Sequence, residues 1–121
     1  MNFDVRTERL SPAASVIALA GEVDLYTAPE FKQRLLEAIA QGATRVVVDL
    51  SDTTFIDSTA LGVLVGAVKR LREHDGRLAL VCNDRNIAKI FEITGLDRVF
   101  AIYGTRPEAV AAIEEELPTS A

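Results

Sequence analysis

The strongest constraint on the fold is a repeated order of segments: an apolar run rich in β-branched residues, then a helical pattern, then a glycine. The runs at 45–50 (RVVVDL) and 78–82 (LALVC) are apolar without alternation, which is typical of strands that are covered on both faces. Each run is followed by a stretch in which apolar residues recur three and four positions apart. This order predicts right-handed βαβ units around a mainly parallel sheet.

The same periodicity predicts four helices. They cover residues 28–41, the stretch from Ser58 to a stop at Asp75 and Gly76, the stretch from Asn83 or Asp84 to a stop at Gly95, and residues 105–117. For the first helix, Thr27 stands at the N-cap position and Glu30 follows three residues later, as in a capping box.

Two alternating segments precede these units. Residues 2–8 and 14–20 predict a hairpin, with Ser11 and Pro12 in its turn. Residues 99–102 form a last short strand, and the polar segment 51–57 is predicted to be a loop. The expected fold is α/β: one domain over residues 1–121, with a mixed, mostly parallel sheet of about five strands, about four helices and an N-terminal hairpin.

Composition narrows the class of protein. A chain of 121 residues with 49% hydrophobic and 26% charged residues fits one compact domain. Its formal charge of −5, with scattered basic residues, argues against a nucleic-acid partner. Its apolar stretches fall short of the ~20 residues that span a bilayer, and its N-terminus lacks a signal-peptide pattern. We therefore expect a cytoplasmic protein without a membrane partner, in a reducing compartment that suits the single Cys82.

Sites in such sheets lie beyond the carboxyl ends of the strands, here at 21–27, 51–59 and 83–86. Within them Ser58 stands at a helix start, where unpaired N–H groups and the helix dipole favour an anion. One interpretation is that Ser58 caps the helix, which is worth about 1 kcal/mol. The other is that its hydroxyl is presented for phosphorylation, with the phosphate seated on the helix terminus. The two interpretations are compatible.

An enzyme is not expected. A nucleophilic Ser58 would need a base within hydrogen-bond reach. The single histidine, His74, lies sixteen residues along the same helix, which is roughly 24 Å away at the helical rise. The chain also lacks a G-x-S-x-G elbow. We therefore predict no catalytic residue and no cofactor.

Four aspartates raise the alternative of a magnesium site or a phosphoacceptor receiver domain: Asp24, Asp49, Asp52 and Asp57. A receiver needs an acidic pair after its first strand and a lysine after its last parallel strand, and neither GEVDLYT nor VFAIYGT supplies them. Asp52 is interpreted as turn chemistry and Asp49 as a strand-end hydrogen-bond acceptor. Asp24 stays open between a structural and a functional role, and no metal site is predicted.

Gly62 and Gly66 form a G-x-x-x-G pair. Lys69 and Arg70 follow too soon for a membrane dimerisation helix. We interpret the two glycines as small residues that let the helix pack closely against the sheet.

The segments GEVDLYTAPEFKQRL and VVVDLSDTTFIDSTALGVLVGAVKRL resemble the bacterial anti-sigma-factor antagonist family, the STAS domain. The resemblance covers nearly the whole chain in order and spacing, and FIDSTALG is its most specific part. It implies that the serine matching Ser58 is phosphorylated by a partner that is both an anti-sigma factor and an ATP-dependent serine kinase. Unphosphorylated antagonist would bind this partner and free the sigma factor, the phosphorylated form would let go, and a PP2C-type phosphatase would reset it.

The resemblance also implies a set of partner-binding residues: Asp24, Asp57, Ser58, Thr59, Ala60 and Gly62. Asp57 would shape the turn before Ser58, and Asp24 would lie beside the acceptor. Thr59 remains a possible second acceptor. Many relatives have glycine where this chain has Ala60, so its methyl group would stiffen the helix start or alter the fit to the kinase.

The expected switch is electrostatic. A phosphate adds about −1.5 to −2 charge, and a helix N-terminus tolerates it, so it should act at the interface rather than unfold the protein. The alternative is a STAS scaffold or small-ligand sensor whose serine is only a cap. In either case we expect a monomer.

Overall fold

The structure, a computed structural model, describes residues 2–114. Its elements, in chain order, are β1 Phe3–Ser11, β2 Ala14–Val23, α1 Ala28–Ala40, β3 Arg45–Ile56, α2 Ser58–Arg72, β4 Arg77–Val81, α3 Arg85–Thr94, the 3₁₀ turn Leu96–Arg98, β5 Ala101–Tyr103 and α4 Arg106–Glu114. The strands form one five-stranded sheet in the order β1-β2-β3-β4-β5. β1 and β2 pair antiparallel and the other pairs are parallel. The predicted mixed sheet with its N-terminal hairpin is confirmed.

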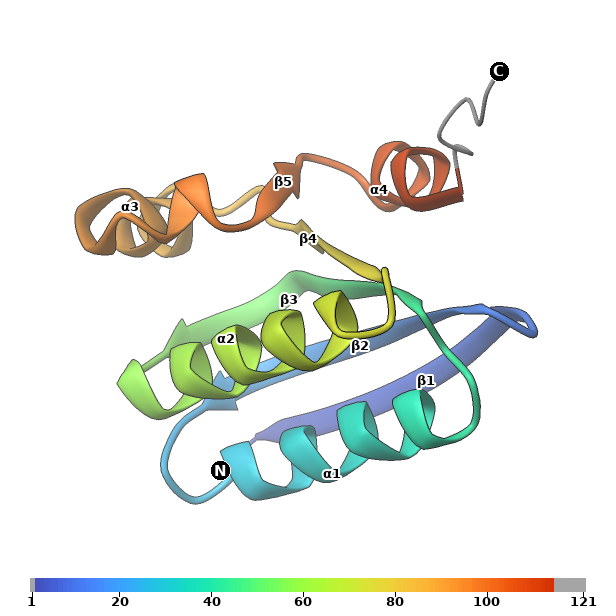
Figure 1. The fold of residues 1–121 in the computed structure, drawn as a ribbon. Coiled ribbons are helices and arrows are strands. Elements are labelled where there is room, and N and C mark those ends of the chain that lie inside the picture. The colour runs from blue at the N-terminus through green and yellow to red at the C-terminus, as the bar shows by residue number, and fades with distance from the viewer. Residues whose placement is uncertain (1, 115–121) are drawn as a thin grey trace.

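The helices cover the two faces of the sheet unequally. One core gathers buried residues of α1, α2 and α3 on one face, and a smaller core places Ala109 and Ile113 of α4 on the other. α1 and α2 lie side by side and run in the same direction (Figure 1). Five apolar positions recur at helical spacing in α2: Leu61, Leu64, Val68 and Leu71 are buried, and Val65 is partly buried against the same core.

The predicted polar loop at 51–57 is wrong, because β3 continues through Ile56. This extension pairs with the end of β2, as far as Val23 beside Ile56. Thr53 is 3% exposed, and its hydroxyl donates a hydrogen bond to the Leu19 carbonyl at 3.1 Å. The polar residues Ser51, Asp52 and Thr54 are exposed, as is Phe55, while Thr53 and Ile56 face inward.

Helix ends follow the prediction more closely. α1 ends at Ala40, one residue before the predicted end, and Gly42 adopts a positive φ of 108°. Asp75 (φ 57°) and Gly76 follow the end of α2. α4 is described to Glu114, and the predicted extension to 117 lies outside the described residues. Among the helices of residues 2–114, none combines the length and apolar character needed to cross a membrane.

Candidate functional site

Asp57, not Ser58, caps α2. Its Oδ1 accepts hydrogen bonds from the backbone N–H groups of Thr59 at 2.9 Å and Ala60 at 3.2 Å. Its own N–H donates to the Val23 carbonyl at 3.2 Å, so the cap is joined to the end of β2. The interpretation of Ser58 as the cap is therefore wrong, because the adjacent carboxylate already occupies the positions that a cap would take.

Ser58 is the first residue of α2 and is exposed to solvent. Within residues 2–114 its hydroxyl makes no hydrogen bond, because Asp57 does the capping in its place. Thr59, the possible second acceptor, is only partly exposed. The geometry therefore presents one freely accessible hydroxyl at the start of this helix.

Asp24 organises the loop between β2 and α1. Its Oδ1 accepts hydrogen bonds from the N–H groups of Tyr26 at 2.9 Å and Thr27 at 3.1 Å. The Thr27 hydroxyl donates to the Glu22 carbonyl at 2.8 Å and accepts from the Asp24 N–H at 2.8 Å. Thr27 thus closes the loop instead of capping α1 with its side chain, and the predicted capping box with Glu30 does not form.

The sheet brings the two aspartates to one edge. Asp24 follows Val23 and Asp57 follows Ile56, and Val23 and Ile56 are register partners at the ends of β2 and β3. The loop between β2 and α1 exposes two large apolar side chains, Leu25 at 62% and Tyr26 at 78%. Asp24 therefore has a structural role in its loop and also lies at the edge where Ser58 is presented.

Ala60 and Gly62 differ in what they offer to a partner. The Ala60 side chain is 1% exposed and belongs to the core, so its methyl group supports the helix start instead of meeting a partner. Gly62 is exposed, as is Gly66. A Cβ added at either glycine meets no atom within 4 Å, so the interpretation that these glycines pack against the sheet is wrong.

Asp84 accounts for the third predicted site region, residues 83–86. Its Oδ1 accepts from the N–H groups of Asn86 at 2.8 Å and Ile87 at 3.1 Å, which makes it the N-cap of α3. The predicted cap at Asn83 or Asp84 is settled in favour of Asp84. Among residues 2–114, no group of three or more His, Cys, Asp or Glu side chains could hold a metal ion.

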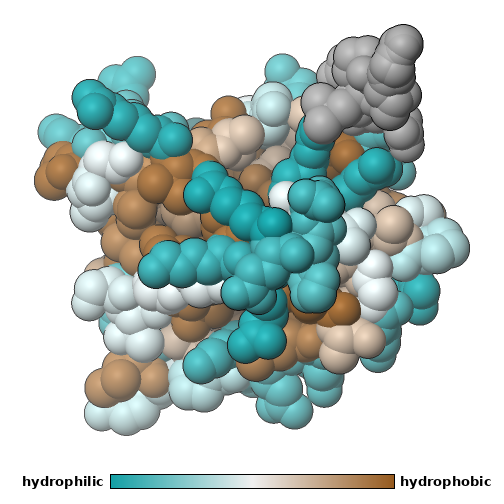
Figure 2. Space-filling view, in the orientation of Figure 1, coloured by the Kyte–Doolittle hydropathy of each residue, from teal (hydrophilic) through white to brown (hydrophobic). Residues whose placement is uncertain are grey.

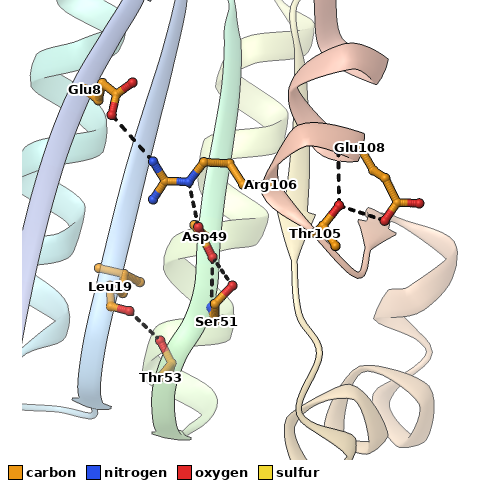
Figure 3. Close-up of polar contacts among 8 residues, drawn as sticks. All are labelled: Glu8, Leu19, Asp49, Ser51, Thr53, Thr105, Arg106 and Glu108. Carbon is orange, nitrogen blue, oxygen red and sulfur yellow. Dashed lines mark hydrogen bonds and ion pairs between the residues drawn. The ribbon is translucent and has the colours of Figure 1, made fainter.

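Asp49 belongs to a polar network on the face of the sheet that α4 covers (Figure 3). Its carboxylate accepts from the Ser51 hydroxyl at 2.6 Å and from Nε of Arg106 at 2.8 Å, and Arg106 also reaches Glu8 at 3.5 Å. Burial raises the pKa of Asp49, but the hydrogen bonds from Ser51 and the contact with Arg106 outweigh it, so the pKa lies below its ordinary value. Sequence reasoning found the acceptor and missed Arg106, which lies 57 residues away.

Comparisons with known proteins agree with this geometry. The family model of the STAS domain matches residues 5–109. The anti-sigma-B factor antagonist of Listeria monocytogenes is 34% identical over 108 residues, which are 89% of this chain and 95% of that protein. The prediction that the chain is not an enzyme agrees with this name, since an antagonist is defined by what it opposes and not by a reaction.

Two solved structures have the same fold. The anti-sigma factor antagonist from Mycobacterium paratuberculosis superimposes with a TM-score of 0.86 at 27% identity, covering 94% of this chain and 96% of that one. The Bacillus cell fate determinant SpoIIAA in its phosphorylated form gives a TM-score of 0.73 at 24% identity, over 92% of this chain and 100% of that one, a likeness of fold alone. By its family model, its relatives and its fold, the chain belongs to the STAS-domain family of anti-sigma-factor antagonists.

Proposed function

We propose that this chain is an anti-sigma-factor antagonist that is switched by phosphorylation of Ser58. Its unphosphorylated form binds an anti-sigma factor that is also a serine kinase, and thereby releases the sigma factor. Phosphorylation by that kinase ends the binding, and a PP2C-type phosphatase restores it. The observation that carries the proposal is the exposed Ser58 hydroxyl, which is left without a hydrogen bond in residues 2–114 while Asp57 caps the helix.

The capping by Asp57 changes how a phosphate would act. The N–H groups of Thr59 and Ala60 already donate to the Asp57 carboxylate, so a phosphate on Ser58 would not simply sit on the helix terminus. It would add about −1.5 to −2 charge beside an existing carboxylate. A partner surface that fits a neutral hydroxyl then faces clustered negative charge, which weakens the complex directly.

Ser58 is proposed as the acceptor in preference to Thr59, because Thr59 is partly covered and Ser58 is exposed. Asp57 acts by holding the backbone of the helix start, and Asp24 by holding the neighbouring loop. ATP belongs to the partner kinase, and the chain itself binds no cofactor. The existence of the same fold in a phosphorylated form supports a phosphate on this scaffold.

Phosphopeptide mapping tests the proposal. The purified chain is incubated with ATP and each anti-sigma kinase encoded in the source genome, and mass spectrometry locates the phosphate. We expect one phosphate on Ser58, its loss in Ser58→Ala, and its retention in the matched Thr59→Val variant. If no such kinase modifies Ser58 or Thr59, or if Ser58→Ala keeps all regulation in cells, the chain is a STAS scaffold or ligand sensor instead.

A further inference from the structure

An apolar groove of about 560 Å³ lies between α1 and α2. Leu36 of α1 and Val63, Gly62 and Gly66 of α2 contribute to its lining. Figure 2 views the molecule from the side of these two helices and shows apolar surface between long hydrophilic side chains. No segment among residues 2–114 fills this groove.

The two glycines leave the backbone of α2 open to a neighbour. Glycine in a helix interior is destabilising relative to alanine. At Gly62 and Gly66 nothing within residues 2–114 requires it, since an added Cβ would meet no atom within 4 Å. A second helix could therefore approach α2 closely along this line.

The charges of the groove indicate what kind of helix it fits. Lys32 and Arg70 are exposed and line the groove, and neither has an ion-pair partner among residues 2–114. Although the chain as a whole carries a net charge of −5, these two cations beside the apolar groove locally complement an acidic partner surface.

The groove is continuous with the site of the proposed phosphorylation. Thr59, which lines the groove, directly follows Ser58. Leu25, from the loop that Asp24 organises, lines the groove as well and is 62% exposed. A partner that reaches Ser58 from this side therefore meets the groove in the same contact.

We propose that the groove receives an amphipathic helix of the anti-sigma kinase. The helix places apolar residues against Leu36 and Val63 and carboxylates toward Lys32 and Arg70. From Thr59 to Arg70 the groove follows about 16 Å of α2, which is enough for anchors at positions i, i+3 or i+4, and i+7 of the incoming helix. This inference rests on the proposed function and assigns its parts to two places. The groove contributes affinity for the kinase whether or not Ser58 is phosphorylated, and Ser58 controls the switch.

Binding measurements on groove variants test the inference. Gly66→Leu fills the groove in open space, and Arg70→Glu reverses one of its charges. Lys69→Leu, on an exposed position of α2 outside the groove lining, and Lys89→Glu, on α3, are the matched controls. By calorimetric titration with the unphosphorylated chain we expect Gly66→Leu to weaken binding of the kinase about 10- to 100-fold. Arg70→Glu should weaken it about tenfold and reduce its salt dependence, and both controls should stay within about twofold.

The outcomes separate this inference from the proposed function. If the kinase binds and phosphorylates the wild-type chain and also binds Gly66→Leu with unchanged affinity, the groove is not the docking site although the switch stands. If no anti-sigma kinase binds the wild-type chain, both proposals fall. Sedimentation of the chain alone tests whether the groove binds a second copy of the chain. Self-association that Gly66→Leu abolishes would assign the groove to that second copy and contradict the proposal of a kinase helix. A melting temperature for Gly66→Leu equal to or above that of the wild type establishes that the variant is folded.

Discussion

α2 and α3 begin in the same way and differ in what surrounds the start. Each follows a parallel strand and is capped by an aspartate, Asp57 or Asp84, whose Oδ1 accepts from the N–H groups two and three residues later. The distances are 2.9 and 3.2 Å at α2 and 2.8 and 3.1 Å at α3. A well-capped helix start at the sheet edge is thus ordinary structure in this fold and does not mark a functional site.

The difference lies one residue later and along the helix. The first helical residue is Ser58 in α2 and Arg85 in α3. At the positions four and eight residues further on, α2 has two glycines, while α3 has Lys89 and the 75% exposed Ile93. α2 therefore combines an exposed hydroxyl at its start with an apolar groove along the helix, whereas α3 begins with Arg85 and carries larger side chains at the equivalent positions. This comparison makes α3 an internal control for α2.

The largest expected effect is on kinase binding, and it distinguishes Ser58 from Arg85, the first residues of α2 and α3. Ser58→Asp introduces a negative charge where the phosphate is proposed, and it should weaken binding of the anti-sigma kinase by about 2 to 5 kcal/mol, or roughly 30- to 5,000-fold. Arg85→Asp at the equivalent position should change it by less than about twofold. Calorimetric titration measures both, and a melting temperature close to that of the wild type shows that the effect is at the interface. Equal losses in the two variants would contradict the comparison.

A second prediction contrasts the ion pair of Arg106 with Asp49, whose side chain is 8% exposed, with the more exposed pair of Arg34 and Glu30. Arg106→Met removes the cation from this buried carboxylate and should lower the free energy of unfolding by about 1 to 3 kcal/mol. The lower end is expected because the Arg106 side chain is 38% exposed and solvent screens the pair. Urea denaturation gives the value, and Arg34→Met, which breaks only an exposed pair with Glu30, is the control. An equal loss in both variants would show that burial of Asp49 does not matter.

The two caps themselves should be equivalent in stability. Asp57→Ala and Asp84→Ala each leave two N–H groups without their acceptor, and each should cost about 1 kcal/mol in urea denaturation. Only Asp57→Ala should also reduce phosphorylation of Ser58, because it loosens the backbone that presents the hydroxyl. A cap at α2 that costs far more than the cap at α3 would break the structural equivalence.

A smaller effect of opposite sign is expected at the glycines. Gly62→Ala and Gly66→Ala should each raise the free energy of unfolding by about 0.4 to 1 kcal/mol, because the added methyl group meets open space and the unfolded chain loses freedom. Thermal unfolding checks this. A loss of stability would mean that the glycines have a packing role within the chain after all.

The smallest effect is the pH dependence of the contribution that Asp49 makes to stability. Its folded-state pKa lies below the ordinary value of 3.8, so its ionised form adds stability above that value, and this contribution is lost as the pH falls through the lower folded pKa. The stability difference between the wild type and Asp49→Asn should therefore be constant near neutrality and shrink below about pH 4. Urea denaturation from pH 3 to 7 measures it, and a difference that grows on acidification would reverse the sign.

Much of the fold was predictable, because burial leaves a period in the sequence. The apolar positions of α2 and the β-branched run of β3 mark residues that are buried in the two cores. The end of β3 was not predictable from period alone: Thr53 and Ile56 face inward among exposed residues, and their pairing with β2 depends on register shifts in the ladder.

The site was predictable in part, and the features that the sequence did not predict were missed for different reasons. Asp57 and Ser58 are both capping residues, so only the geometry separates the cap from the exposed hydroxyl. The groove had a usable signal, since Gly62 and Gly66 lie off the helical stripe of Leu61 and Leu64. The contact between Arg106 and Asp49 had none, because no local pattern links residues 57 positions apart.

The bond from the Asp57 N–H to the Val23 carbonyl ties the start of α2 to the sheet, and it bears on how fast the proposed switch operates. The helix start is an extension of a strand ladder, so its backbone has little room to rearrange when Ser58 is modified. The two states would then differ in charge and share one shape, without a slow refolding step between them. The response time of such a switch is set by the enzymes that add and remove the phosphate, and not by a conformational change of this chain.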